Sequence, residues 1–270
     1  MKIRTLLSKI FSFLLILTLT ACSIPTGRPT PTPTLPGGSP AGGTTPSEAG
    51  SGGSGSGNCT NPLWPIVPNA KWEYASSGSD TGDYTFTQTI SLVRPDGFTL
   101  DVEYSTGVYA SQEWSCAGGD LTSMNPTSGS AASLSTLNGV NAQTDTDGVA
   151  GVTLPASIAP EATWAQTYDI SGDVSMPGGK HGSAQGTYGS DYKAIGTETV
   201  SVPAGTFEAM RIEVQMTYNL TITLEDLEVP TSVGTVLTMW YAPGVGLVKV
   251  ESANDIMGAE TIELTYYHIP

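Results

Sequence analysis

The sequence predicts an all-β fold of antiparallel strands, and three observations carry the prediction. Many segments beyond residue 58 are rich in Val, Ile, Thr, Tyr and Phe. Several of them alternate apolar and polar residues with a period of two, which is typical of a sheet with one buried and one wet face. No window longer than a turn or two shows helical periodicity.

The strands predicted from these patterns cover 84–93, 97–105, 198–202, 210–225, 235–241, 247–252 and 261–269. In the clearest case, 211–218, alternate side chains are expected to face the core: Ile212, Val214, Met216 and Tyr218. The stretch from Asn125 to Glu161 is rich in Ser, Ala and Gly and weakly patterned. We expect it to form a long loop with at most one short helix.

The segment VSVPAGTFEAMRIEV, residues 200–214, is predicted to form a strand, a tight turn and a second strand. Pro203 fixes φ and Gly205 can adopt φ > 0, so the chain reverses and Phe207 enters the core.

The segment TVLTMWYAPGVGLVKVES, Thr235–Ser252, is predicted to form the same arrangement of strand, turn and strand. Pro243 cannot donate to a strand ladder, and the two glycines that follow it permit a turn or bulge. Trp240 and Tyr241 then point to opposite faces. A turn between strands explains this segment without a ligand.

A repeated order of tryptophans and Pro-Gly turns indicates two related β-subunits. The order Trp, Pro-Gly turn, Trp occurs at Trp72, 95–97 and Trp114, and again at Trp164, 203–205 and Trp240. Chance is the alternative, because such turns are common in β-proteins.

The N-terminus carries three basic residues followed by an apolar run, Ile10–Leu19, that is too short for a membrane-spanning helix. The run ends in Leu19-Thr20-Ala21-Cys22, which resembles the lipobox of bacterial lipoproteins. The resemblance implies cleavage after Ala21 and lipidation of Cys22, and two or more acyl chains anchor a protein stably to a membrane. Plain secretion is the alternative.

These features divide the chain into a signal peptide (1–21), a lipid anchor with a disordered tether (22–57) and a β domain (58–270). The tether is rich in Pro, Thr, Gly and Ser and cannot bury enough apolar surface to fold. The Cys59 and Cys116 pair favours a disulfide in an exported chain. A metal site is a poor alternative, because the Cys and His spacings of zinc sites are absent.

The charge balance excludes some partners. The chain has a net charge of −15, and removing the signal peptide, with three basic and no acidic residues, changes it to −18. This excess of negative charge argues against nucleic-acid binding.

No catalytic, cofactor or metal signature appears, so we expect neither an enzyme nor a bound cofactor. His181 in a Gly-rich loop and His268 near the end are expected to be solvated. The acidic residues of Gln143–Gly148 alternate as in a calcium loop. The first ligand position is Gln143 instead of Asp, and Leu154 at the twelfth cannot coordinate, so we expect a turn with solvated Asp side chains.

The VPAGTF and WYAPGVGLVK segments resemble the C-terminal half of a group of exported bacterial β-proteins of unknown function. The resemblance covers about 192–269. It implies a strongly curved antiparallel sheet or half-barrel, similar to periplasmic lipoprotein carriers, and no activity.

We therefore expect an extracytoplasmic lipoprotein, sorted to the outer membrane where two membranes exist. Its concave face would bind an apolar small molecule or lipid chain, and the alternative is a structural protein with a filled core and an envelope protein partner. The candidate ligand-facing side chains are Trp72, Trp114, Trp164, Trp240 and Tyr218.

Overall fold

The protein is described by a computed structural model. It covers residues 59–78, 82–125, 141–176, 180–224, 227–254 and 258–270. The predicted signal peptide, the predicted lipidation site Cys22 and the predicted tether lie outside these residues. Within them the fold is all-β, as predicted, and no helix is present.

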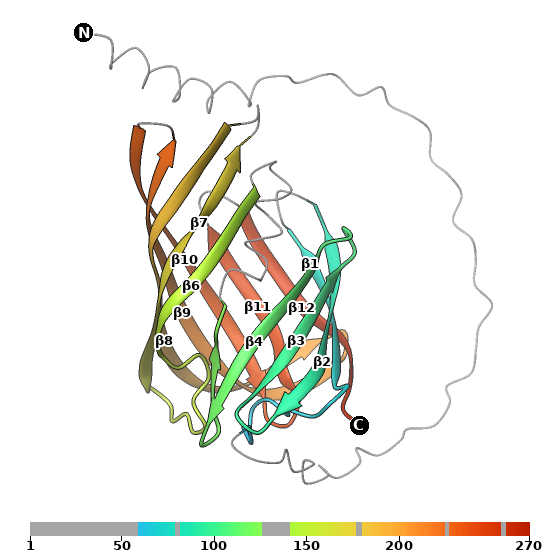
Figure 1. The fold of residues 1–270 in the computed structure, drawn as a ribbon. Helices are drawn as coiled ribbons and strands as arrows, with labels where there is room; N and C mark the ends of the chain where they lie inside the picture. Colours follow the sequence, from blue (N-terminus) through green and yellow to red (C-terminus); the bar gives the residue numbers. More distant parts are fainter. Residues whose placement is uncertain (1–58, 79–81, 126–140, 177–179, 225–226, 255–257) are drawn as a thin grey trace, which may run out of the picture. The chain divides into compact units, whose positions relative to one another are not determined.

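The described strands form one twelve-stranded antiparallel sheet (Figure 1). Their bounds are β1 Lys71–Ser77, β2 Tyr84–Arg94, β3 Gly97–Tyr104, β4 Tyr109–Ala117, β5 Asp120–Ser123, β6 Asn141–Gly151, β7 Thr163–Met176, β8 Lys180–Val202, β9 Gly205–Leu224, β10 Leu227–Ala242, β11 Gly246–Asn254 and β12 Gly258–His268. The order is β5-β4-β3-β2-β1-β12-β11-β10-β9-β8-β7-β6, so each strand pairs with the next one along the chain except β5 with β6, and β1 also pairs with β12.

The sheet curls until its two edges, β5 and β6, approach each other. An isolated bridge joins Leu121 on β5 to Leu154, just after β6. The backbone nitrogens of Leu121 and Leu154 each donate to the other residue's carbonyl, at 2.9 Å in both cases. The sheet therefore nearly closes at this place, which we call the seam.

Two expectations about loops are wrong. Residues 141–151 form β6 rather than part of a long loop, so Gln143–Gly148 lies in a strand and not in a turn. His181 lies on β8, opposite Ser175 of β7, and not in a loop. In β6 and at His181 of β8, hydrogen bonds to the backbone of β7 form the strand. These residues are strands although few of their side chains are apolar. Farther along β8, the neighbouring strand comes so close that a Cβ at Gly186 would lie 1.9 Å from the backbone oxygen of Asn219, so this position needs glycine.

The repeated Trp and Pro-Gly positions lie at equivalent places in β1–β4 and in β7–β10. Trp72 and Trp114 lie on β1 and β4, with the 95–97 turn between β2 and β3. Trp164 and Trp240 lie on β7 and β10, with the 203–205 turn between β8 and β9. This placement agrees with a repeated four-stranded unit, although a relationship between the two units stays a prediction.

The segment before β1, residues 59–70, closes one end of the curled sheet, and we call it the plug. Asn61 is buried, and its Nδ2 donates to the carbonyls of Gly119, Leu154 and Pro155 at 2.9, 3.4 and 3.2 Å. Its Oδ1 accepts hydrogen bonds from the backbone nitrogens of Leu63 and Trp64. One amide thus fixes the plug to both sides of the seam.

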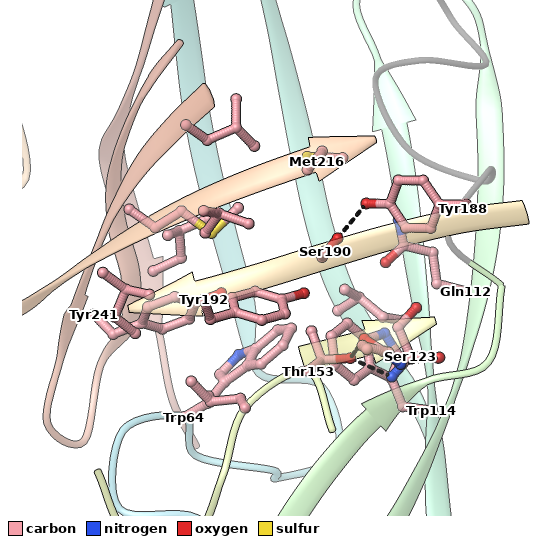
Figure 2. A pocket seen from close by; sticks show the side chains of 18 of the residues that line it. Trp64, Gln112, Trp114, Ser123, Thr153, Tyr188, Ser190, Tyr192, Met216 and Tyr241 are labelled. Carbon is pink, nitrogen blue, oxygen red and sulfur yellow. Dashed lines mark hydrogen bonds between the residues drawn. The ribbon is translucent and has the colours of Figure 1, made fainter. Parts of the chain in front are cut away.

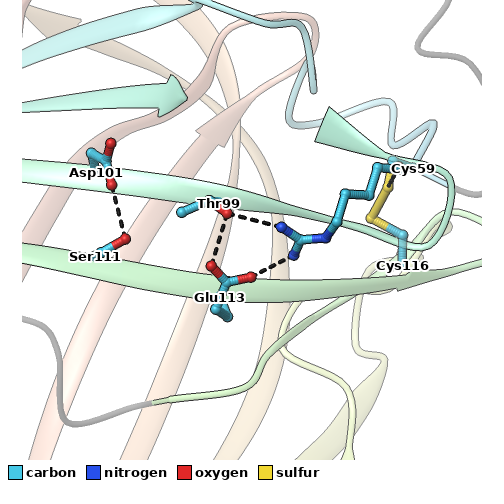
Figure 3. A network of polar contacts seen from close by, with 7 residues as sticks. Cys59, Thr99, Asp101, Ser111, Glu113 and Cys116 are labelled. Atoms are coloured by element: carbon cyan, nitrogen blue, oxygen red, sulfur yellow. Dashed lines mark hydrogen bonds and ion pairs between the residues drawn. A yellow bond between two sulfur atoms is a disulfide. The ribbon is translucent and has the colours of Figure 1, made fainter. Parts of the chain in front are cut away.

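A disulfide holds the start of the plug. It joins Cys59 to Cys116 at the end of β4, with a sequence separation of 57 and a Cα–Cα distance of 5.0 Å. Figure 3 shows it beside an ion pair between Arg94 and Glu113, in which Thr99 bonds both partners. The disulfide contributes about 4 kcal/mol in the chain-entropy model, whereas an exposed ion pair contributes roughly 0–1 kcal/mol.

Candidate functional site

The interior of the curled sheet contains a cavity of about 240 Å³ (Figure 2). Its walls come from β2, β3, β4 and β5 and from β7, β8, β9, β10 and β11, and Trp64 of the plug also lines it. Three larger hollows, of about 340 to 510 Å³, are more open to solvent. We take this cavity, the least open of these four hollows, as the candidate site, because small-molecule sites bury most of their ligand.

The wall formed by β9, β10 and β11 is apolar. Ile212 and Val214 are 1% exposed, and Met216 continues the same face of β9. The predicted inward face of 211–218 is therefore confirmed for these three residues. Leu237 and Met239 lie opposite them on β10, in register with Val214 and Ile212.

The wall at the seam is polar, and backbone chemistry explains why. The outer edge of β5 has no complete partner strand, so its carbonyls need other donors. Gln166 Nε2 and the Tyr168 hydroxyl, both on β7, donate to the carbonyl of Ser123 at 3.1 and 2.8 Å. Thr153 Oγ1 donates to Gln166 Oε1 at 2.5 Å. Side chains therefore close the seam where strand pairing stops, and they line the cavity.

Four tyrosines complete the wall. The Ser190 hydroxyl donates to the Tyr188 hydroxyl at 2.9 Å, and Figure 2 shows this pair on β8. Burial raises the pKa of each phenol above its ordinary value of 10, so all four stay neutral at physiological pH: Tyr168, Tyr188, Tyr192 and Tyr241. No Asp, Glu, Lys, Arg or His is among the described residues that line the cavity.

Of the candidate ligand-facing residues, Trp114 lines the cavity. Its ring stacks on Phe98, with ring centroids 5.6 Å apart, and meets the edge of Trp64 at 5.0 Å. Trp72 lies in the core instead, where its Nε1 donates to the carbonyl of Val245 at 2.6 Å.

The other three candidates lie elsewhere. Trp164 packs face to face on the cavity-lining Tyr192, at 5.2 Å between ring centroids. Tyr218 packs on Tyr188 beyond the cavity, at 4.5 Å. Trp240 is covered by charged side chains: its Nε1 donates to Glu198 Oε1 at 2.6 Å, and the Lys249 ammonium lies 5.4 Å from its ring centroid.

The Thr235–Ser252 segment is a turn between β10 and β11. Tyr241 lines the cavity and Trp240 does not, which agrees with the predicted opposite faces. Gly246 has φ 107°, and a Cβ there would lie 3.0 Å from Trp64 Cδ1. Glycine at this position therefore allows the positive φ of the turn and leaves room for Trp64 of the plug. At the other predicted turn, Phe207 is half-buried against Tyr267.

Several site residues were missed from the sequence. Trp64 was not among the candidates, because the plug lacks a strand pattern. The polar seam residues Ser123, Thr153 and Gln166 sit in weakly patterned stretches, and no local signal predicts that they meet.

Within the described part of the chain, no group of three or more His, Cys, Asp or Glu residues could hold a metal ion. That part also contains no helix long and apolar enough to cross a membrane. His181 and His268 are both exposed.

A model of a family described as DUF3108-like matches residues 108–257, which is more than half of the 270-residue chain. A crystal structure from Bacteroides fragilis NCTC 9343, of a protein assigned as exported and with a YmcC-like fold, is 16% identical, with a TM-score of 0.50. The match covers 78% of this chain and 100% of that chain.

A protein from Parabacteroides distasonis ATCC 8503 that is assigned as a lipoprotein is also 16% identical, with a TM-score of 0.49 over 77% of this chain and 99% of that chain. No curated protein matches the sequence. At this level of identity, similarity to solved structures shows the fold alone.

Proposed function

We propose that this chain, which belongs to the DUF3108-like family, is an exported, lipid-anchored protein of the cell envelope that binds an apolar small molecule or lipid chain inside its curved sheet. In this proposal the protein is a binding module and not an enzyme. The observation that carries it is the cavity of about 240 Å³ inside the curled sheet, with an apolar wall on β9 to β11 and polar groups at the seam. This volume lies just below the usual range of about 300–1,000 Å³ for ligand pockets.

Export is supported by three independent features. The N-terminus has a basic region, an apolar run and Cys22 in a lipobox-like setting. The Cys59–Cys116 disulfide is of a kind that persists in oxidising compartments. The chain also shares its fold with a protein assigned as exported. Substituting Cys22→Ser should release the protein from the membrane fraction, and normal retention of this variant would refute the lipid anchor.

The apolar wall continues beyond the cavity, which supports a ligand with a long apolar part. On β9, alternate residues after Met216 keep the face of Ile212 and are apolar: Tyr218, Leu220, Ile222 and Leu224. Their partners on β10 include Leu227 and Val229, which are 49% and 38% exposed. A ligand longer than the cavity would extend along this face.

The alternative of a scaffold protein with a strand-adding partner has less support. Such a partner needs an unprotected edge, and β6 is the longer of the two edge strands of the described sheet. Asp145 and Asp147 on β6 are exposed, and charged residues on an edge strand oppose pairing with another chain.

The cavity can be tested with two neighbouring substitutions on β10. Leu237 lines the cavity, whereas Val236 is 51% exposed and does not line it. Leu237→Trp should fill the cavity and abolish the fluorescence rise of the uncharged probe N-phenylnaphthylamine. Val236→Trp, the matched control, should leave probe binding unchanged. Equal binding by both variants, or no binding by the unmodified protein, would overturn the proposed function.

A further inference from the structure

One buried hydrogen-bond donor in the cavity wall has no partner. Only three buried side-chain polar atoms in the described part of the chain lack a hydrogen bond, and Trp114 Nε1 is the one among them that belongs to a cavity-lining residue. Trp114 is 7% exposed, and stacking on Phe98 fixes its ring. A buried donor without an acceptor is costly, so native proteins usually satisfy it.

The polar groups that line the cavity near Trp114 bond one another, and none of them is bonded to its indole nitrogen. Trp114 lies opposite Ser123 in the β4–β5 ladder, which places it at the seam. There the Ser123 carbonyl accepts from Gln166 and Tyr168, and Gln166 Oε1 accepts from Thr153. Tyr188 accepts from Ser190. The seam groups are therefore bonded among themselves, whereas the indole N–H of Trp114 has no acceptor in the described part of the chain.

The wall also carries no charge that could balance a charged ligand. Its described lining residues are apolar, hydroxyl, amide or aromatic, and its phenols are neutral. An ion moved into this cavity would lose its hydration without gaining a counterion, and that is expensive. The cavity therefore favours uncharged molecules.

We propose that the cavity selects an uncharged amphiphile whose carbonyl or ester oxygen accepts a hydrogen bond from Trp114 Nε1, while its apolar part lies against β9 and β10. This inference rests on the proposed function and specifies its ligand class. In this arrangement the polar seam receives the oxygen, and the wall of Ile212, Val214 and Leu237 receives the hydrocarbon.

The test compares two uncharged fluorescent probes of similar size. Prodan carries a ketone, whereas N-phenylnaphthylamine has no carbonyl. Trp114→Phe removes the donor and keeps an aromatic ring. We expect it to weaken prodan binding about three- to tenfold, the equivalent of one neutral hydrogen bond, and to weaken N-phenylnaphthylamine binding by much less. The emission of bound prodan should also move to shorter wavelength, because its carbonyl loses a hydrogen bond.

A second measurement covers the case in which Trp114→Phe does not fold. The unmodified protein labelled with ¹⁵N has five tryptophans, and hence five indole N–H signals. Prodan should shift one signal downfield, and N-phenylnaphthylamine should not reproduce that shift. Equal effects of the two probes on affinity and on the indole signals would overturn the role of Trp114 and leave the cavity intact. Failure of both probes to bind would instead overturn the proposed function.

Discussion

Asn61 should contribute more to stability than any other single amide in the plug, since the seam and the plug meet at its side chain. A side-chain amide has two N–H donors and one carbonyl acceptor. In Asn61 the donors face three carbonyls and the oxygen accepts from two backbone nitrogens. Asn61→Ala therefore removes about four hydrogen bonds at a buried site, at roughly 1 kcal/mol each before water or relaxation compensates. We expect the free energy of unfolding to fall by about 2–4 kcal/mol.

The assay is urea unfolding followed by tryptophan fluorescence, with the disulfide intact in both proteins. Asn219→Ala is the matched control, because Asn219 is an exposed asparagine on β9 that accepts one hydrogen bond from Ser232. Its effect should stay within about 0.5 kcal/mol. The reasoning fails if Asn61→Ala is as mild as this control, since the plug would then be held by apolar packing alone.

Two further predictions concern stability. Replacing Cys59 and Cys116 together by serine should lower the free energy of unfolding by about 4 kcal/mol in the chain-entropy model, measured by urea unfolding; a change below about 1 kcal/mol would contradict the pairing. Stability should also fall as the pH rises above about 10. The phenols of the unfolded chain ionise near pH 10, whereas burial raises the pKa of the cavity tyrosines above that value, so the folded state binds more protons there. Full stability is expected below pH 10, and a midpoint of urea unfolding that does not change between pH 8 and pH 11 would contradict the buried phenols.

Strands rich in β-branched and aromatic residues could be predicted from the sequence because their local pattern agrees with their final environment. This holds for β2, β3 and β9, where the predicted bounds lie within a few residues of the observed ones. β6 and the first half of β8 are different. They are rich in Gly, Ser, Thr and Asp, and long-range pairing with neighbouring strands, rather than local propensity, makes them strands.

The candidate site was harder to predict, since alternation shows that two residues face opposite sides but not which side is concave. Trp240 and Tyr241 illustrate this, because the side that lines the cavity is that of Tyr241. Trp240 instead lies under Lys249 and beside Glu198. The polar seam depends on Ser123 meeting Gln166 across 43 residues of chain, and neither neighbourhood carries a signal for that contact.

Native mass spectrometry of the full-length protein, extracted gently from its own membrane, tests the ligand cavity most directly. The account predicts a population that carries one small, uncharged, carbonyl-containing molecule, and the loss of that molecule in the Leu237→Trp variant. A chain that shows only its own mass, with or without the substitution, would contradict it.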